Sequence, residues 1–201
     1  RNVVTCNKPR YIGQAILDIS KVIMYDFHYN YILEEYPETE LLFTDTDSFC
    51  YFIPTETDLY QDIRNRTDRF DFSNYEEDHP NYNKCNHLKP GMFKDEMGGV
   101  PICEFCGLRS KMYSILKWDK KEKKTANGVI RQVKDNVLTH ENYKETLCSK
   151  KIRCDEGCKI FQKGHNLYTV NFSKNTLSPY NDKNWISFNE DEFTTYSYGH
   201  Y

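Results

Sequence analysis

Two aspartates one residue apart are the side chains of this sequence best suited to chemistry. Asp45 and Asp47 flank Thr46 in a polar segment, and Ser48 follows them. On extended backbone, side chains two residues apart point to the same side, so both carboxylates can face one space. Close carboxylates repel each other unless a cation offsets their charge. Magnesium suits such a site, because it binds one or two protein carboxylates and completes its shell with water and phosphates.

Three other interpretations of the acidic segment compete with a magnesium site. An EF-hand loop that started at Asp45 would place Cys50 where the loop requires glycine, which excludes it. An aspartic protease dyad takes its carboxylates from two separate loops, and no second loop of that kind is evident. A plain turn stays open, since aspartate is a common turn former.

The neighbouring residues predict the elements that would position the two carboxylates. Apolar runs at 41–43 and 49–52 flank the polar residues 44–48, a pattern typical of a β-hairpin with two buried strands over 41–52. Upstream, apolar residues at three- and four-residue steps predict a helix over 12–36, which ends before Pro37. Buried strands would hold the acidic tip rigidly, as a catalytic site requires.

Shorter elements are expected in the rest of the chain. Residues 58–90 are polar with little periodicity, which predicts an irregular insertion with a short helix. The pattern then predicts strands at 92–94, 100–105 and 111–118, a charged turn at 120–124, and a helix at 139–147 with Thr139 as its cap. We expect loops in the remaining residues. The fold class is therefore α+β, with an antiparallel sheet and a packed helix.

The net charge of −3 conceals an asymmetry along the chain. Residues 1–100 carry a net charge of −8, residues 101–201 one of +5, and residues 107–163 alone one of +8. A protein that holds cations at one place and a polyanion at another would have this pattern, as would two differently solvated surfaces. The content of 16 Tyr, 12 Phe and 2 Trp favours a packed core over disorder. No apolar run approaches the ~18 residues of a membrane helix, so we expect no membrane partner.

The eight cysteines are expected to be reduced and buried, because no export signal accompanies them. A zinc site is the alternative, with Cys103 and Cys106 as one pair. The other ligands would come from Cys154, Cys158, Cys85 and His87. On a strand, however, Cys103 and Cys106 would face opposite sides, which favours single buried thiols.

The segment Leu42-Phe43-Thr44-Asp45-Thr46-Asp47-Ser48 resembles motif C of family B DNA polymerases, whose core is D-T-D-S at the tip of a palm hairpin. Further segments resemble the protein-primed polymerases of Polinton/Maverick elements, which belong to the organellar and viral type B group. They are the preceding helix around 13–29, residues 93–96 and 107–113 with the K-x-Y motif and its lead-in, and residues 180–183 and 198–201. The resemblance covers nearly the whole chain. It implies a C-terminal palm and thumb fragment of such a polymerase.

This resemblance implies a DNA-directed DNA polymerase, which adds dNTPs to a primer 3′-hydroxyl with two Mg²⁺ ions. Asp47 would bind metal, Asp45 would support the metal site or the local charge, and Thr46 and Ser48 would hold the turn. Both aspartates are the expected catalytic residues.

The K-x-Y motif corresponds to Lys111 and Tyr113, which the resemblance implies hold the primer strand near its end. Backbone contacts of this kind carry no sequence information. The expected DNA-binding residues also include Arg109 and the basic run of Lys117, Lys120, Lys121, Lys123 and Lys124. A solvated charged turn is the alternative for that run.

The sequence lacks two motifs of a complete family B polymerase. Motif A, of the form D-x-x-S-L-Y-P, supplies another metal-binding aspartate, and motif B, of the form K-x₃-N-S-x-Y-G, supplies a lysine for the nucleotide. Since both precede motif C in the family and the sequence opens at Arg1, we expect a piece of a longer protein whose N-terminal part carries them together with an exonuclease. Residues 1–118 would be the C-terminal part of the palm and residues 119–201 a small, basic, thumb-like module. The fragment alone would be inactive.

The expected partners are primer/template DNA, dNTP, the missing N-terminal part of the polymerase and a terminal protein. The expected location is intracellular, in the nucleus of a eukaryotic host. Two alternatives stay open: a non-catalytic DNA-binding relic of such a polymerase, and a structural zinc-binding module.

Overall fold

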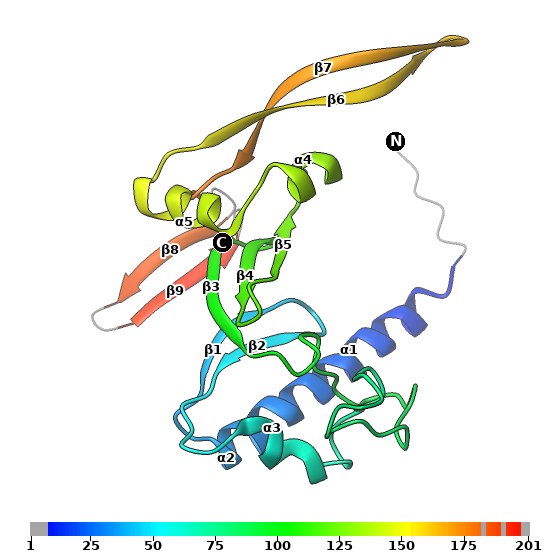
Figure 1. Ribbon diagram of the computed structural model, residues 1–201, viewed down its shortest axis with the longest axis vertical. Coiled ribbons are helices and arrows are strands. Elements are labelled where there is room, and N and C mark those ends of the chain that lie inside the picture. Colours follow the sequence, from blue (N-terminus) through cyan, green and yellow to red (C-terminus); the bar gives the residue numbers. More distant parts are fainter. Residues whose placement is uncertain (1–7, 182–183, 190–191, 198–201) are drawn as a thin grey trace. The chain divides into compact units, whose positions relative to one another are not determined.

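A computed structural model describes residues 8–181, 184–189 and 192–197 of the chain. The chain divides into two compact units, Arg1–Gly99 and Val100–Tyr201, and each unit is considered by itself (Figure 1). Both contain helices and small antiparallel sheets. This mixed composition is compatible with the α+β class that the sequence predicts.

A long helix opens the first unit. Helix α1, Arg10–Phe27, continues into a π-helical turn at His28–Ile32 and the short helix α2, Leu33–Glu35. The helix predicted over 12–36 is therefore confirmed, and it begins two residues earlier. Its residues Met24, Phe27, Tyr31 and Ile32 are buried, whereas most side chains before Met24 are exposed. The helix thus uses its C-terminal half to pack within the unit.

The hairpin predicted over 41–52 is confirmed. Strand β1, Glu40–Thr44, pairs antiparallel with β2, Phe49–Phe52, and Thr44 lies opposite Phe49 next to the turn. The expected burial of both strands is wrong for β1, because Leu41 and Leu42 are exposed by 41% and 43%, and it holds only in part for β2, where Cys50 is buried but Phe52 is exposed. The hairpin packs on the helix through side chains of β2.

The irregular insertion after the hairpin also matches its prediction. Its regular parts are helix α3, Leu59–Asp62, and a 3₁₀ turn at Ile63–Asn65. The strand predicted at 92–94 is wrong, because Phe93 forms only an isolated parallel bridge with Phe70. Two backbone hydrogen bonds make that bridge, and no further residues of the segment continue the pairing.

A buried carboxylate fixes the chain beside this bridge. Asp71 is only 1% exposed, accepts a hydrogen bond from the Ser73 amide at 2.9 Å, and lies 3.1 Å from the Lys94 ammonium. Burial acts to raise the pKa of Asp71, but the hydrogen bonds from Ser73 and the charge of Lys94 outweigh it and lower the pKa to about 2. The ionised form of Asp71 therefore stabilises the first unit.

This pKa makes the first unit sensitive to acid. A carboxyl whose folded pKa lies below its ordinary value contributes stability above that ordinary value of 3.8, and this contribution is lost as the pH falls towards about 2. We expect Asp71→Asn to be less stable than the native chain at neutral pH, with a difference that shrinks below pH 3.8 and vanishes near about 2. An NMR titration of the Asp71 carboxyl checks the cause. A midpoint at its ordinary value would contradict it.

The second unit is built on a three-stranded antiparallel sheet. Strands β3, Ile102–Arg109, β4, Met112–Lys117, and β5, Glu122–Ala126, lie in chain order. The strands predicted at 100–105 and 111–118 are confirmed. The charged turn predicted at 120–124 is wrong from Glu122 onwards, because these residues pair with β4.

The boundary between the units differs from the sequence-based division. Along the chain the first unit ends at Gly99 and the second begins at Val100, whereas the sequence-based division ended the first part at residue 118. Strands β4 and β5 lie on either side of residue 118 and pair with each other, so a division there would cut the sheet. The assignment of these parts to palm and thumb stays a prediction.

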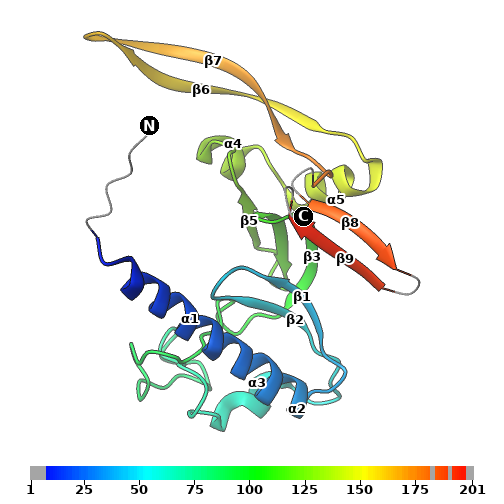
Figure 2. The ribbon, with the colours of Figure 1, turned by 180° about the vertical axis from the view of Figure 1, so that it is seen from behind.

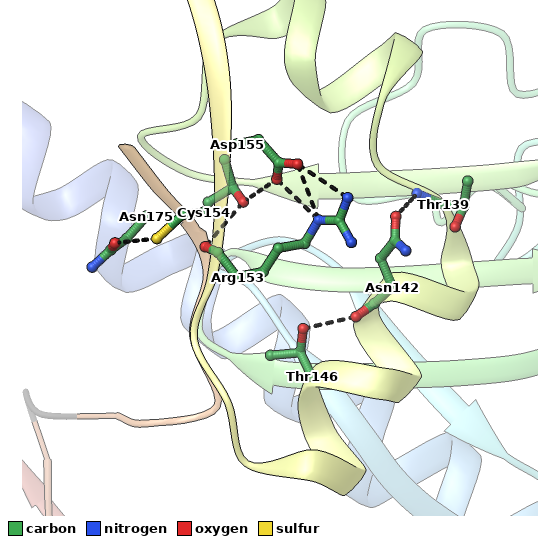
Figure 3. A network of polar contacts seen from close by, with 8 residues as sticks. Thr139, Asn142, Thr146, Arg153, Cys154, Asp155 and Asn175 are labelled. Carbon is green, nitrogen blue, oxygen red and sulfur yellow. Dashed lines mark hydrogen bonds and ion pairs between the residues drawn. The ribbon is translucent and has the colours of Figure 1, made fainter. Parts of the chain in front are cut away.

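Two helices pack against the sheet of the second unit. Helix α4 spans Arg131–Asn136 and helix α5 spans His140–Ser149. The Thr139 amide donates to the Asn142 side chain at 3.0 Å, which confirms Thr139 as the N-cap residue (Figure 3). The core combines sheet and helix residues, namely Cys106, Leu108, Met112, Ala126, Leu138, Tyr143 and Leu177.

Two further hairpins follow where the sequence predicted loops. Strands β6, Arg153–Lys163, and β7, Asn166–Leu177, form a long two-stranded ribbon, and β8, Asn184–Asn189, pairs with β9, Glu192–Ser197. The prediction of loops is wrong here. Most residues of the ribbon are exposed on both faces, so its sequence lacks the alternation of apolar and polar residues that marks a half-buried strand.

A polar network holds the base of the ribbon (Figure 3). The Arg153 guanidinium contacts both oxygens of Asp155 at 3.0–3.2 Å. The Thr176 hydroxyl on β7 donates to the Arg153 carbonyl at 3.2 Å. Burial acts to raise the pKa of Asp155, yet the bonds from Arg153 and Thr176 lower it. The two strands are thus tied where they leave the core.

Over the described ranges, no helix combines the length with the apolar character that crossing a membrane requires.

Candidate functional site

The acidic tip of the first hairpin is a tight turn. The Asp47 amide donates to the Asp45 carbonyl at 2.7 Å, and Thr46 between them has a φ of 62°. A hydrogen bond across three residues with a positive central φ defines the rarer, strained form of the γ-turn. The Asp45 amide also donates to the Ser48 carbonyl at 3.1 Å, which closes the wider turn.

This turn removes the basis on which the sequence analysis expected both carboxylates on one side. The sequence argument assumed extended backbone, whereas the segment bends sharply at Thr46. Alternation along a strand therefore does not govern the directions of Asp45 and Asp47. The Asp47 side chain is exposed and that of Asp45 is partly buried, so the turn presents carboxylate oxygen at the end of the hairpin.

Two hydroxyls add local support to the turn. The Ser48 hydroxyl donates to the Asp45 carbonyl at 3.3 Å, and the Thr46 hydroxyl lies 3.4 Å from an Asp45 carboxylate oxygen. These contacts agree with the turn-holding role expected for Ser48 and Thr46. Their part in a metal site stays a prediction.

Thr46 is an unfavourable residue for its conformation. A β-branched side chain at positive φ costs about 1–2 kcal/mol, because its Cβ crowds the backbone. Strained residues of this kind cluster at active sites and binding loops. This is a signal that sequence reasoning missed, since the pattern D-T-D does not reveal the sign of φ.

Replacing the strained threonine should therefore stabilise the hairpin. We expect Thr46→Gly to raise the free energy of unfolding by about 0.5–1 kcal/mol, since glycine relieves the steric cost and loses part of the gain to chain entropy. The matched control is Thr44→Gly in β1, which we expect to lower it by about 1 kcal/mol. Amide exchange of β2 measures both changes. Equal losses in the two variants would contradict the strain.

An aromatic cluster supports the hairpin from the helix side. Phe49 follows Ser48 directly and packs against Phe27, with ring centroids 6.4 Å apart. Tyr51 stacks on His28, with centroids 5.7 Å apart, and its hydroxyl lies 3.0 Å from His28 Nδ1. Burial raises the pKa of Tyr51, so its phenol stays protonated and available as a hydrogen-bond partner.

Phe27 is the centre of this cluster. Its ring stacks on Phe93 with centroids 3.8 Å apart and meets Phe70 edge-on at 5.7 Å. The Phe27 side chain of α1 thereby joins β2 to Phe70 and Phe93, the two residues of the isolated bridge.

Charged residues of the insertion also hold the helix. Arg69 contacts Asp26 at 2.6 Å and Arg66 contacts Glu35. Both guanidinium groups lie over the ring of Tyr31, at 5.5 Å for Arg66 and 5.8 Å for Arg69. Hydrogen bonds from Asn30 and Arg69 lower the pKa of Asp26, which keeps it ionised for the pair.

Removing the central ring should release the hairpin. We expect Phe27→Ala to destabilise the first unit by about 3–5 kcal/mol, because it leaves a cavity between the rings of Phe49, Phe70 and Phe93. Tyr25→Ala on the same helix is the control and should change stability by less than about 0.5 kcal/mol, since Tyr25 is 60% exposed. Amide exchange of Cys50 and Tyr51 reports the stability of the hairpin. Similar effects of the two variants would refute the role of Phe27.

The described residues contain no cluster of three or more histidine, cysteine, aspartate or glutamate side chains able to hold a metal ion. The tip thus offers two carboxylates, which is the number that Mg²⁺ takes from a protein when phosphates complete its shell. The zinc alternative needs four ligands and gains no support from the described residues.

The cysteines match their prediction only in part. Cys50 and Cys106 are buried, and burial raises the pKa of both thiols, which keeps them protonated. Cys103 is partly buried. The prediction of burial is wrong for the four exposed thiols, namely Cys85, Cys148, Cys154 and Cys158, and Cys6 lies outside the described residues.

The K-x-Y residues lie at the first turn of the second unit's sheet. Lys111 is in the turn between β3 and β4, with a φ of 56°, and its carbonyl accepts a hydrogen bond from the Asn127 amide at 2.9 Å. Tyr113 lies within β4, between Gly107 and Thr125 of the neighbouring strands, and its ring stacks on Phe105 at 6.0 Å.

One face of this sheet is more basic than the other. Residues two apart on a strand share a face, which places Tyr113 and Lys117 together on β4. Lys123 of β5 lies opposite Ile115 and therefore belongs to the same face. The opposite face carries the core residue Met112.

The remaining basic residues occupy different environments. Lys120 and Lys121 are exposed in the turn between β4 and β5, where Asp119 lies 3.1 Å from Lys121 and 3.8 Å from Lys117. Arg109 reaches the Tyr180 carbonyl at 3.5 Å. The expectation for Lys124 is corrected: its side chain is only 14% exposed and donates to the carbonyl of Leu138, which lies between α4 and α5. Lys124 therefore joins the sheet to this connection rather than facing DNA.

Three contacting polar side chains in this unit, Ser114, His140 and Glu104, have the residue types of a hydrolase triad. His140 Nδ1 lies 2.9 Å from the Ser114 hydroxyl, and His140 Nε2 lies 3.5 Å from Glu104. Ser114 and His140 are 0% and 1% exposed, so a substrate has no access to the hydroxyl. These three side chains are therefore structural, and they join α5 to β3 and β4.

No protein-family model matches the sequence, and neither a curated protein nor a solved structure matches it. The arguments about function therefore rest on the residues and their geometry.

Proposed function

We propose that this chain is the C-terminal palm and thumb part of a protein-primed family B DNA polymerase. One observation carries the proposal: D-T-D-S forms the strained tip of a β-hairpin, and aromatic contacts pack the hairpin on the preceding helix. Motif C has this sequence at this position in the family that the chain resembles. A plain turn needs neither the strain at Thr46 nor a rigid base.

The chemistry follows from the charge at the tip. Transfer of a nucleotidyl group to a 3′-hydroxyl requires a deprotonated attacker, in-line geometry and neutralisation of the triphosphate, which two Mg²⁺ ions supply. Asp47 would bind a metal through its exposed carboxylate, and Asp45 would support the site from its partly buried position. Two carboxylates on one turn do not complete a two-metal site, so a further carboxylate from the longer protein would be needed.

The second unit would hold the primer strand. Lys111 and Tyr113 match the K-x-Y motif, and Lys117 and Lys123 share the face of Tyr113. Exposed Lys120 and Lys121 would add contacts to phosphates. Such contacts are independent of sequence and weaken as salt rises. Lys124 is excluded from this set because its ammonium donates to the Leu138 carbonyl.

Primer extension by the longer protein that contains this chain tests the proposal. We expect Asp47→Ala to reduce template-directed incorporation by at least about a hundredfold, since electrostatic stabilisation of this kind contributes ~10²–10³ in rate. The fold and DNA affinity should be retained, because the carboxylate is exposed. Glu56→Ala is the matched control, an exposed carboxylate beyond the hairpin, and should extend primers normally.

Two outcomes would contradict different parts of the proposal. Normal extension by Asp47→Ala would exclude the tip as a metal site. DNA binding without any extension by the native longer protein would instead favour a non-catalytic DNA-binding relic.

A further inference from the structure

The ribbon of β6 and β7 has a composition unlike the rest of the chain. From Gly157 to Leu177 it contains no aspartate or glutamate, although the chain as a whole has 30 of them. The same residues include Lys159, Lys163 and Lys174. Lys174 lies opposite Asp155 near the base, so the positive charge of the outer part of the ribbon comes from Lys159 and Lys163, which makes it complementary to a polyanion.

The register of the ribbon places aromatic and basic side chains on one face. Phe161 lies directly opposite Tyr168, so these rings are neighbours across the strands. The next positions on this face hold Lys159 on one side of the pair and Lys163 on the other. We call these residues, together with Phe172, the aromatic face of the ribbon.

The inner end of the aromatic face is built around a glycine. Phe172 lies opposite Gly157, and a Cβ added to Gly157 would come within 2.6 Å of the Phe172 ring. The ring can therefore lie flat over the strand only because the opposite residue has no side chain. The Lys159 ammonium lies 5.9 Å from the centre of this ring, so lysine and aromatic side chains interleave.

The aromatic face is exposed and has a firm base. Phe161 and Tyr168 are 47% and 48% exposed, and the outer part of the ribbon extends away from the other elements of its unit (Figures 1 and 2). At the base, Arg153 contacts Asp155 (Figure 3). The Thr176 hydroxyl of β7 also donates to Asp155, which ties the two strands together. Neighbouring rings on paired strands that are open to solvent are suited to stacking on flat ligands.

We propose that the aromatic face of the β6–β7 ribbon binds single-stranded DNA. The rings of Phe161 and Tyr168 stack on unpaired bases, while Lys159 and Lys163 contact the phosphates on either side. In a duplex the faces of the bases are covered by their neighbours, so only single strands engage the rings. This inference goes beyond the proposed function, which concerns the primer duplex. Only the choice of DNA over RNA rests on that proposed function.

The test measures, by fluorescence anisotropy, how labelled oligo-dT of about 12 nucleotides binds to the 201-residue chain in the absence of Mg²⁺ and dNTP. We expect Phe161→Leu and Tyr168→Leu each to weaken binding about five- to a hundredfold, because leucine keeps the apolar contact but has no π face. The matched controls lie on the opposite face, Ile160→Ala and Leu167→Ala, at residues 77% and 71% exposed. They should bind like the native chain.

Duplex and salt measurements separate this site from the primer site. The leucine variants should bind a duplex of the same length with less than a twofold change. Replacing Lys159 and Lys163 with glutamine should reduce the slope of log K against log salt for oligo-dT by ~1.4, at ~0.7 per phosphate contact. Since no metal is present, these results do not depend on Asp45 and Asp47.

A second measurement covers the case in which a leucine variant unfolds the ribbon. In the native chain, oligo-dT should shift the ring proton resonances of Phe161 and Tyr168, because stacked bases shield them. Unchanged ring resonances at saturating oligo-dT would overturn the proposal. So would equal losses of oligo-dT and duplex binding in the leucine variants, tighter binding of oligo-rU, or self-association of the chain through the ribbon.

Discussion

The packing of Phe27 against three other rings is the contact on which the first unit depends. Phe49, Phe70 and Phe93 come from the hairpin, the insertion and the segment after it, and all of them meet on this one side chain of α1. Strand β1 is largely exposed, so the hairpin has no other apolar base of comparable extent among the described residues. The position of the acidic tip is thus fixed by the packing of Phe49, two residues after Asp47, on Phe27.

This constraint explains how a strained turn can persist. A β-branched residue at positive φ is stable only where the surroundings determine its backbone. At the tip, hydrogen bonds from the amides of Asp45 and Asp47 close the turn, and Phe49 anchors the strand that leaves it. The base of the ribbon in the second unit is similar, because buried Leu177 and the hydrogen bond from Thr176 to Asp155 fix two strands whose outer parts are exposed.

The sequence predicted the elements that bury apolar residues at regular steps. The helix over 12–36 and the hairpin over 41–52 were found in this way, and Thr139 marked its helix because its side chain is suited to a cap. Strand β5 was missed because all five residues at 120–124 are charged, and the pairing of Glu122 onwards with β4 cannot be read from local composition. The ribbon was missed because both of its faces are exposed.

The candidate site was predictable in identity but not in geometry. Asp45 and Asp47 stand out by type and spacing, whereas the γ-turn at Thr46 arises from hydrogen bonds that close the hairpin. The burial of Lys124 also depends on a distant residue, Leu138. Local pattern therefore identifies chemical groups, and tertiary contacts decide which of them reach solvent.

Paramagnetic relaxation by Mn²⁺ tests most directly whether the tip attracts a divalent cation. The ion substitutes for Mg²⁺ and broadens the NMR signals of nearby amides, so it can be titrated into the ¹⁵N-labelled chain. The acidic segment at 76–78 provides an internal control with three consecutive carboxylates. We predict that the amides of Asp45, Thr46 and Asp47 broaden at lower Mn²⁺ than those of residues 76–78. Equal broadening of both segments, or earlier broadening of the control, would contradict a metal site at the hairpin tip.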